Sequence, residues 1–482
     1  MPWLRSRGEA VAGGGRTPWV LASLVSVAWA AGFPLLSGLG TQRLWGVCAG
    51  AGYLLAGVAA VLLPRRWVAR GVVGTALLGG WLVPYLVITA TGWSQSEVVV
   101  VRRSARLLLH TGSPYLAHPG LVTDYNPYFP GMALFGLAGD PRLWFLAVFA
   151  ACLAGSWLLV RGRWPRGGPG GRTRGGWVLP LAAVVASPLV ALPAAVGGVD
   201  LPMIGLCCLG LAFAERDRAV AAGLALALAC ALKWTAWPAV PVALLLIAAQ
   251  GRAARGRASR GRALRGAEAL GDSRASRVPW ASRVPSAPRA GATWRAVLRC
   301  GLVAVGGAAV LVVPPVLRTP GAAFEQVVRF PLGLSRMPTP AGSPLPGHLL
   351  ASFGGPGRAV ALALLGVAAA GLAAWLVRRP PVTAVQACDR LAAGLGAAFL
   401  LAPEGRFGYL QLPVLLVLWP RLAAAGTRLG GAAVRGRERG RGRRRGRAVE
   451  AVEAGEAGEQ AAGRAAGRVG ESERASAVPA RR

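Results

Sequence analysis

The chain has 482 residues, of which 54% are hydrophobic and 15% are charged. Apolar runs long enough to cross a bilayer recur along it. They exclude a string of soluble domains and predict an all-α fold, a polytopic transmembrane helical bundle, because helices satisfy their own backbone groups in lipid. The formal net charge is +35, but the excess arginine lies in short loops between apolar runs and in a C-terminal tail. That pattern is typical of cytoplasmic loops, so we expect no nucleic-acid partner.

The apolar runs predict about 10–12 spans, and the count depends on residues 220–249. That stretch is long for one span and short for two. Pro238 and Pro241 favour a break near KWTAWP, which gives two short helices and twelve spans. One long helix, with Asp200–Ala214 not crossing, would give ten. The preferred spans are Pro18–Leu39, Leu44–Leu63, Gly71–Thr91, Leu143–Val160, Trp177–Val196, Asp200–Ala214, Val220–Ala231, Trp237–Ala249, Val297–Leu317, Ala359–Val377, Thr383–Leu401 and Phe407–Pro420.

The distribution of arginine predicts the orientation of these spans. The basic N-terminus lacks a small-residue cleavage site, so we expect the first apolar run to be a retained span and not a signal peptide. With the N-terminus inside, the arginine-rich loops fall in the cytoplasm, and the two longest loops, 92–142 and 318–358, fall outside. The chain is therefore predicted to be a multi-pass plasma membrane protein with both termini cytoplasmic.

Composition also divides the chain into parts. Low-complexity basic sequence predicts disorder in the loop 250–296 and in the tail, where a basic block could contact anionic lipid. The seven cysteines form no CxxC motif and are interpreted as packing residues. The predicted parts are 1–70, a cytoplasmic segment with a transmembrane hairpin; 71–249, a core with the outer loop 92–142; 250–296, a cytoplasmic loop; 297–420, C-terminal spans with the outer loop 318–358; and 421–482, a cytoplasmic tail.

Polar and chemically reactive side chains concentrate between Trp93 and Gly131. Glu97 follows a predicted span closely, so it is expected at the outer surface of the membrane. The next residues, VVVVRRSARLLLHTG, have the spacing of a short amphipathic helix that Gly112 would end. A carboxylate beside guanidinium groups suits a reaction on an anionic lipid headgroup, because arginine binds phosphate with a fork of donors. The alternative is an outer loop whose charges are only solvated.

The order of these pieces resembles a known family. An acid after a span (Glu97), G-x-x-Y (Gly112 to Tyr115) and Y-x-P (Tyr125-Asn-Pro-Tyr-Phe-Pro130) are similar to the first extracytoplasmic loop of glycosyltransferase family 87. Residues 197–246 resemble the later core of that family, in which a polar outer turn, a span and a basic turn precede a helix with a lysine at its outer end, here Lys233. The resemblance covers about residues 71–249. The sequence departs from it in having Glu where Asp is common, and the first two spans look like an added hairpin.

The resemblance implies a GT-C type membrane enzyme. Such an enzyme would move a sugar, mannose in this family, from a polyprenyl-phosphate carrier to a lipid- or polymer-linked envelope glycan on the outer face, with inversion. Glu97 would be the general base that deprotonates the acceptor hydroxyl, and Asp124 is the second candidate. Partners would be the polyprenyl-phosphate sugar, the glycan acceptor and membrane lipids. No cofactor is firmly implied, and a divalent metal is neither required nor excluded.

Further residues are candidates for substrate binding. Lys233 is the only lysine, and we expect it to bind the donor phosphate unless it merely extends to the interface beside Trp234 and Trp237. Asp200 could pair with Lys233, line the site or, by default, cap the helix that begins at Leu201. The outer loop 318–358 could be a lid, an acceptor site or a proline-rich connector. The other candidates are Arg102, Arg103, Arg106, His110, Tyr115, Tyr125, Tyr128, Arg336 and His348.

Two other functions compete with the transferase. A transporter or flippase of an amphiphilic, anionic lipid-linked substrate would place functional charges near mid-membrane in two similar halves, which the sequence does not display. A non-catalytic envelope assembly protein would need no catalytic geometry. The transferase hypothesis instead expects Glu97, Asp124, Arg102 or Arg103, and Lys233 to line one outward-facing cavity.

Overall fold

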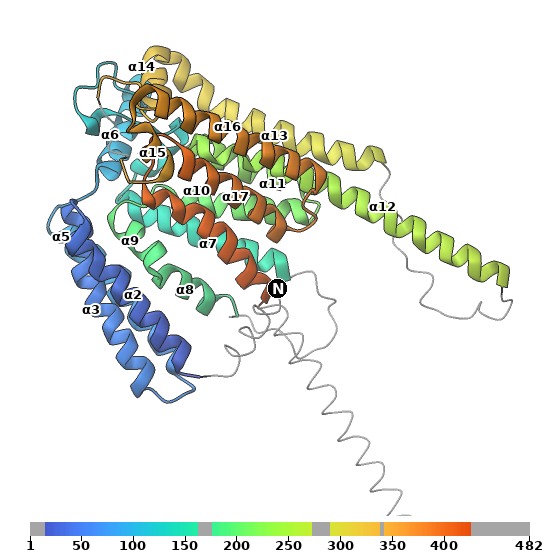
Figure 1. Ribbon diagram of the computed structural model, residues 1–482, viewed down its shortest axis with the longest axis horizontal. Coiled ribbons are helices and arrows are strands. Elements are labelled where there is room, and N and C mark those ends of the chain that lie inside the picture. The colour runs from blue at the N-terminus through green and yellow to red at the C-terminus, as the bar shows by residue number, and fades with distance from the viewer. Residues whose placement is uncertain (1–14, 162–175, 272–289, 338–341, 426–482) are drawn as a thin grey trace, which may run out of the picture. The chain divides into compact units, whose positions relative to one another are not determined.

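The computed structural model describes residues 15–161, 176–271, 290–337 and 342–425 (Figure 1). Within these ranges all regular elements are helices, apart from one isolated bridge between Gly342 and Gly405. Nine described helices are long and apolar enough to cross a membrane, or ten if a bent pair counts as one span. The predicted all-α bundle is confirmed, and every predicted span overlaps a helix. The tail after residue 425 lies outside the described residues.

The N-terminal helices form a separate hydrophobic cluster on one side of the bundle (Figure 1). Trp45 is fully buried there, and its indole Nε1 donates to the Gly80 carbonyl at 2.9 Å. A π-helical turn at this contact places Gly79 against Gly52 of the neighbouring helix. The elements are α2 (Thr17–Leu36), α3 (Gly40–Leu62), α4 (Val68–Leu77), η1 (Leu78–Leu82) and α5 (Val83–Ala90).

The central helices explain the uncertain span count. The stretch 220–249 is broken, as the prolines predicted: one helix ends at Leu232, a short 3-10 turn follows, and the next helix begins at Ala239. Another predicted span is bent by 67° at Ser187. The elements are α7 (Pro141–Arg161), α8 (Val178–Ala186), α9 (Pro188–Val196), α10 (Leu201–Glu215), α11 (Ala219–Leu232), η4 (Trp234–Ala236) and α12 (Ala239–Gly271).

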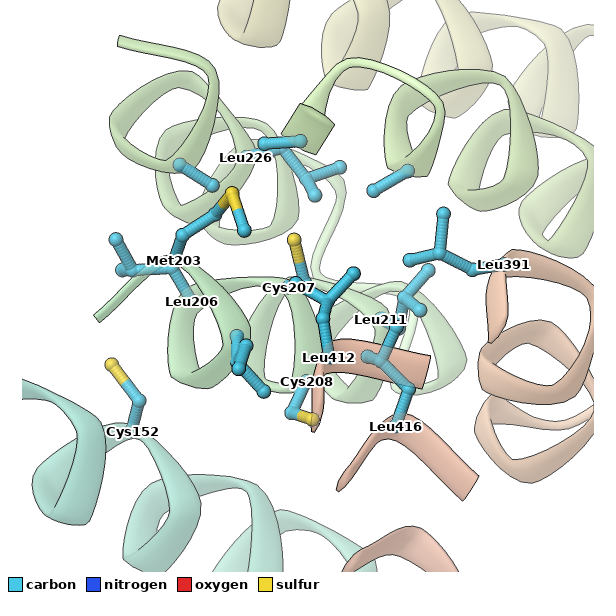
Figure 2. Close-up of a cluster of buried hydrophobic side chains, with 14 of the residues drawn as sticks. Cys152, Met203, Leu206, Cys207, Cys208, Leu211, Leu226, Leu391, Leu412 and Leu416 are labelled. Carbon is cyan, nitrogen blue, oxygen red and sulfur yellow. The ribbon is translucent and has the colours of Figure 1, made fainter. Parts of the chain in front are cut away.

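Helix α10 is the centre of the packing. It contacts α7, α11, α12 and α17, and nearly every residue along it is buried (Figure 1). Figure 2 shows its Cys207 and Cys208 among leucine side chains, with Cys152 of α7 beside them. The cysteines that the structure describes are free thiols, and all but the half-buried Cys48 are buried. The interpretation of cysteine as a small packing residue is confirmed for these positions.

The predicted disordered loop is partly helical. Helix α12 continues through Gly271, beyond the ends of α10 and α11, and the next helix begins at Ala290 (Figure 1). The prediction of disorder was wrong for 250–271 and 290–296, because alanine and arginine are strong helix formers even in low-complexity sequence. Residues 272–289 lie outside the described ranges.

The C-terminal part supplies the last spans. Its elements are α13 (Ala290–Arg318), α14 (Pro320–Phe324), η6 (Glu325–Arg329), α15 (Pro346–Ala351), α16 (Gly354–Arg378), α17 (Ala384–Leu401) and η7 (Phe407–Leu410), and the last span covers Phe407–Ala425. Helix α16 packs on α15 and α17 and contacts α12, and much of its surface is exposed, with apolar side chains such as Val360 and Val367 on it. An apolar exposed helix of this kind is suited to lipid contact.

The first long loop folds as its sequence predicted. Its elements are α6 (Ser96–Thr111), η2 (Val122–Asp124) and η3 (Pro130–Gly136). Helix α6 is amphipathic, with Val98, Val101 and Ala105 buried and Arg106 exposed. Gly112 ends it in the left-handed conformation at φ +73°, which glycine adopts without the steric cost of a Cβ.

The second long loop packs on the first. Gln326 is fully buried, and its Oε1 accepts from the Asn126 backbone N–H at 3.0 Å while its Nε2 donates to the Leu116 carbonyl at 2.6 Å. Tyr125 stacks on Phe330, with ring centroids 4.3 Å apart. The segment around Gln326 therefore closes over the first loop, as a lid would, and is not a loose connector.

The contact between α3 and η1 yields a stability prediction. A Cβ on Gly52 would lie 2.4 Å from the Gly79 Cα. Gly52→Ala should therefore force the helices apart and lower the free energy of unfolding by ~1–3 kcal/mol. Thermal unfolding of the purified protein measures this effect. Gly50→Ala, in the same helix but facing open space, is the control; equal melting temperatures for both variants would contradict the prediction.

The buried glutamine yields a second prediction. Gln326→Ala leaves a backbone donor and a backbone acceptor of the first loop unpaired, at a cost of ~1–3 kcal/mol each. We expect faster proteolysis between residues 113 and 130, measured by mass spectrometry of the fragments. Val328→Ala is the control, because this neighbouring side chain is exposed. Unchanged cleavage rates in Gln326→Ala would show that the two loops are not held together by this residue.

Candidate functional site

One cavity of about 530 Å³ lies between the two long loops and the C-terminal helices, and residues of both line it. Its polar end is formed by α6, the start of α10, the end of α11 and the segment after α17. From there an apolar part continues between α12, α16 and α17. Small and aliphatic side chains line this groove, among them Ala368, Leu372, Gly394 and Ala398. The cavity thus combines a charged pocket with a long apolar groove.

Two ion pairs occupy the polar end. Glu97 Oε1 accepts from Arg406 Nη1 at 3.0 Å, and Asp200 Oδ1 accepts from Lys233 Nζ at 2.8 Å. The side chains of Glu97 and Lys233 are 18% and 11% exposed, and those of Arg406 and Asp200 are 32% and 23% exposed. Glu97 with Arg406 and Asp200 with Lys233 therefore face one cavity as two matched pairs, in a partly dry environment where unpaired charge is costly.

Local structure explains where three of these groups lie. Glu97 is in the first turn of α6, where a carboxylate is favoured by the helix dipole. Lys233 follows α11 in an extended conformation that ends the helix and turns its side chain toward α10. Asp200 occupies the N-cap position of α10 but makes no side-chain capping bond. The capping interpretation of Asp200 was wrong, and its pairing with Lys233 is what the structure contains.

Aromatic rings surround the lysine. Lys233 Nζ lies 5.0 Å from the ring centroid of Tyr409 and 5.8 Å from that of Tyr128, within the range of cation–π attraction. Burial lowers the pKa of Lys233, but Asp200 and Tyr409 together outweigh burial and raise it above its ordinary value. Burial also raises the pKa of Tyr128, and the carboxylates of Glu97 and Asp200 add to that rise. The ammonium is therefore charged and the Tyr128 phenol neutral at physiological pH.

The segment that carries Arg406 is fastened by the second long loop. Ser343 N–H donates to the Gly405 carbonyl at 3.0 Å, and Phe407 N–H donates to Ser343 Oγ at 3.2 Å. His348 Nδ1 lies 3.0 Å from the Pro403 carbonyl oxygen. The loop 318–358 thus contacts both the first loop and the arginine segment, which fixes the polar end from two sides.

The structure separates the other predicted residues from this centre. Both carboxylate oxygens of Asp124 are engaged: Oδ1 accepts from Arg103 Nη1 at 3.1 Å, and Oδ2 accepts from the backbone N–H groups of Gly120 and Leu121. Arg102 lies 3.7 Å from Asp140. Asp124, Arg102 and Arg103 do not line the cavity. The expectation that they would share it with Glu97 and Lys233 was therefore wrong, because α6 directs its arginines away from the cavity.

The remaining candidates divide in the same way. Tyr125 and Tyr128 line the cavity. Tyr115 is buried behind them, and its hydroxyl donates to the Tyr128 carbonyl at 3.0 Å. His348 lies 4.0 Å from Glu404, a cavity residue, but does not line the cavity itself. Three candidates are exposed and outside the cavity: Arg106, His110 and Arg336.

Sequence reasoning missed Arg406, Glu404 and Tyr409, which all line the cavity. They lie in PEGRFGY, at the end of the bundle predicted to be outside: Glu404 and Arg406 between two predicted spans, and Tyr409 in the first turn of the second of these spans. Charged residues are unusual in such a short outer turn, since the positive-inside rule places arginine at the other end. That exception was the available signal.

A further ion pair, also missed, positions α6 and α9. Arg142 is buried, binds Asp140 through its Nε and Nη2, and donates to the Ala195 carbonyl at 2.9 Å near the end of α9. Burial raises the pKa of Asp140, but the bonds from Arg142 outweigh it and hold that pKa below its ordinary value. The end of α9 in turn lies beside Glu97, because a Cβ on Gly197 would come within 3.8 Å of Glu97 Oε2.

The described part of the chain does not offer the cluster of ligands that a metal ion needs. Among the described residues, no group of three or more His, Cys, Asp and Glu side chains could hold a metal ion. Two of the acids at the polar end, Glu97 and Asp200, are each within bonding distance of a cation from the chain itself. The groups present can therefore bind an anion, by exchange with these carboxylates, and can accept a proton.

Residues 129–290 match the sequence model of glycosyltransferase family 87. No curated protein and no solved structure matched the chain. The match includes Asp200 and Lys233 and begins after Glu97. The resemblance found in the sequence is confirmed over these residues: this third of the chain is similar to glycosyltransferase family 87, and it lies within a bundle of helices that are long and apolar enough to cross a membrane.

Proposed function

We propose that the protein transfers a sugar, mannose, from a polyprenyl-phosphate carrier to a lipid- or polymer-linked glycan on the outer face of the membrane. The observation that carries this proposal is the single cavity in which two cation–carboxylate pairs open directly into an apolar groove. An amphiphile with an anionic head and a long hydrocarbon chain matches both parts. A soluble nucleotide sugar would leave the groove empty.

The groove has the dimensions of a site for a lipid chain. From Ala402 to Arg390 along α17 its lining extends ~18 Å at ~1.5 Å per residue, a large part of a ~30 Å hydrocarbon core. Helix α16 forms one wall and exposes apolar side chains on its other faces. The outer faces of α16 are therefore apolar, which suits a wall between a prenyl-chain site and the bilayer.

The donor phosphate is proposed to bind between Lys233 and Arg406. Both cations face the cavity, and each is neutralised in the free protein by one carboxylate. A phosphodiester that contacts the two cations replaces these carboxylates as counter-ion. Arginine offers a fork of donors and lysine a compact charge, so the two suit a phosphate approached from two sides.

The same exchange frees the proposed base. Once Arg406 contacts phosphate, the Glu97 carboxylate can accept the proton of the acceptor hydroxyl. The hydroxyl oxygen then forms a bond to the anomeric carbon while the bond from that carbon to the phosphate oxygen breaks, with inversion. The electron pair leaves with polyprenyl phosphate, whose added negative charge Lys233 and Arg406 stabilise. The proton remains on Glu97 until it passes to water.

The orientation of the chain supports an outer-face reaction. Arginines of the loop after α3, such as Arg65 and Arg66, and those of α12 beyond Gln250 lie at the end of the bundle away from Glu97. The positive-inside rule places that end in the cytoplasm and the cavity mouth outside. Nucleotide sugars are absent there, which is consistent with a lipid-linked donor.

The first test removes the base. Glu97→Gln keeps the shape of the side chain but cannot accept the proton, so we expect transfer from polyprenyl-phosphate mannose to fall by ~10²–10⁴. The measurement is labelled sugar incorporation in membranes that contain the full chain. Asp124→Asn should retain much more activity, because its carboxylate is engaged in the loop. Glu325→Gln, an acid outside the cavity, is the matched control. Undiminished turnover in Glu97→Gln would exclude this residue as the base.

The second test concerns the phosphate. Lys233→Ala and Arg406→Ala each remove a charge-assisted hydrogen bond worth ~1.5–3 kcal/mol, so the KM for the donor should rise about tenfold or more. The KM for the acceptor should change much less. Arg43→Ala, an exposed arginine at the same end of the bundle, serves as control. Equal effects on donor and acceptor KM would argue against phosphate binding by these cations.

A further inference from the structure

The far end of the groove contains a charged residue that the proposed reaction does not use. Arg390 lines the cavity from α17, twelve positions before Ala402, and is the charged lining residue outside the polar end among those the structure describes. An arginine beside hydrocarbon is costly in a membrane span, so such residues are retained where they have a partner or a role.

Two contacts hold the side chain of Arg390 in place, and one of its nitrogens is left without a partner in the described part of the chain. Its guanidinium carbon lies 3.1 Å from the ring centroid of Trp375 in α16, in a stacked arrangement. Its Nη2 donates to the Arg379 carbonyl at 3.2 Å, in the connection between α16 and α17. Its Nε is buried and has no hydrogen-bond partner in the described structure. The side chain thus bridges the two helices that form the walls of the groove, at the point where the groove ends.

We propose that Arg390, held in place by Trp375, forms the floor of the groove and determines how much of the donor's prenyl chain packs inside the protein. This inference rests on the proposed lipid-linked donor and adds a specificity-determining residue to it. The chain enters at the charged mouth and follows the small side chains of α17. It stops at the guanidinium, because displacing Arg390 would break its stacking on Trp375 and its bond to Arg379. Isoprene units beyond that point turn out into the bilayer.

Small side chains line the groove between its polar end and Arg390, so a prenyl chain can pack along it as far as Arg390. Gly394 and Ala398 lie on α17 one and two turns from Arg390 in the direction of the polar end, and Leu372 faces them from α16. Packing against these side chains, and not transfer from water, must supply the affinity for a chain that already lies in lipid. Affinity is therefore expected to increase with chain length only until the terminal isoprene reaches the floor.

The test uses prenyl monophosphates from farnesyl to undecaprenyl, which carry no sugar and so report on the groove independently of transfer. Full-length protein in nanodiscs is titrated with each lipid, and a photoreactive group at the chain terminus is cross-linked and mapped. For the wild type, affinity should level off at an intermediate length, and cross-links should advance along α17 and stop at Arg390 and Trp375.

Two variants should shift that length in opposite directions. Arg390→Ala opens the floor, so longer chains should gain several-fold in affinity and label residues beyond position 390. Ala398→Phe raises the floor, so affinity should level off at shorter chains. Arg379→Ala is the control, because only the backbone of Arg379 is used. The same levelling length in all four proteins, or labels scattered without regard to chain length, would overturn the proposal. Length dependence without sugar transfer would refute the proposed function alone.

Discussion

The charges at the mouth of the groove are the constraint on which the rest of the site depends. Glu97 and Asp200 would be costly where they lie without Arg406 and Lys233, because a partly buried carboxylate loses hydration that only a close cation restores. The four groups come from four separate parts of the chain. Their mutual neutralisation therefore couples the first loop, the core hairpin of α10 and α11, and the segment after α17 into one unit.

Because the four charges must meet, the segments that carry them are held in position by several further hydrogen bonds. Gln326 binds two backbone groups of the first loop, and Ser343 and His348 hold the segment that carries Arg406. Arg142 performs the same task beneath α6 by joining Asp140 to the end of α9. Except for the exposed bond between Phe407 and Ser343, these contacts are hydrogen bonds between buried or half-buried groups, which specify geometry because a misplaced partner leaves an unsatisfied donor or acceptor.

The pairing also gives a physical reason for the order of events in the proposed reaction. In the free protein the two cations are already neutralised by carboxylates. An anionic lipid then binds by replacing these carboxylates as the counter-ion. The carboxylate that the anion displaces is then available as a proton acceptor next to the bound donor. Activation of the base and occupation of the donor site are, on this view, one event.

The sequence by itself determined the class of fold and most of its elements. Apolar run length fixed the helices, Pro238 and Pro241 marked the break before α12, and Gly112 marked the end of α6, because each of these features acts through local backbone geometry. The family resemblance identified Lys233, and the charge pattern singled out Glu97. Residue type alone gave two wrong predictions: a helix cap at Asp200, because of its position before α10, and disorder in 250–271, because of its low-complexity composition.

Only the tertiary structure decided which polar residues meet. Arg406 is 309 positions from Glu97, and no local pattern predicts a contact between residues so far apart. Arg103, in the same helix as Glu97, pairs with Asp124 of η2 away from the cavity because the helical period of α6 turns Arg103 to another face. Arg390 appears in sequence as one more charge near a membrane surface. The packing of α16 against α17 places it inside the groove, since a side chain's surroundings in a bundle are set by neighbouring helices and not by its own.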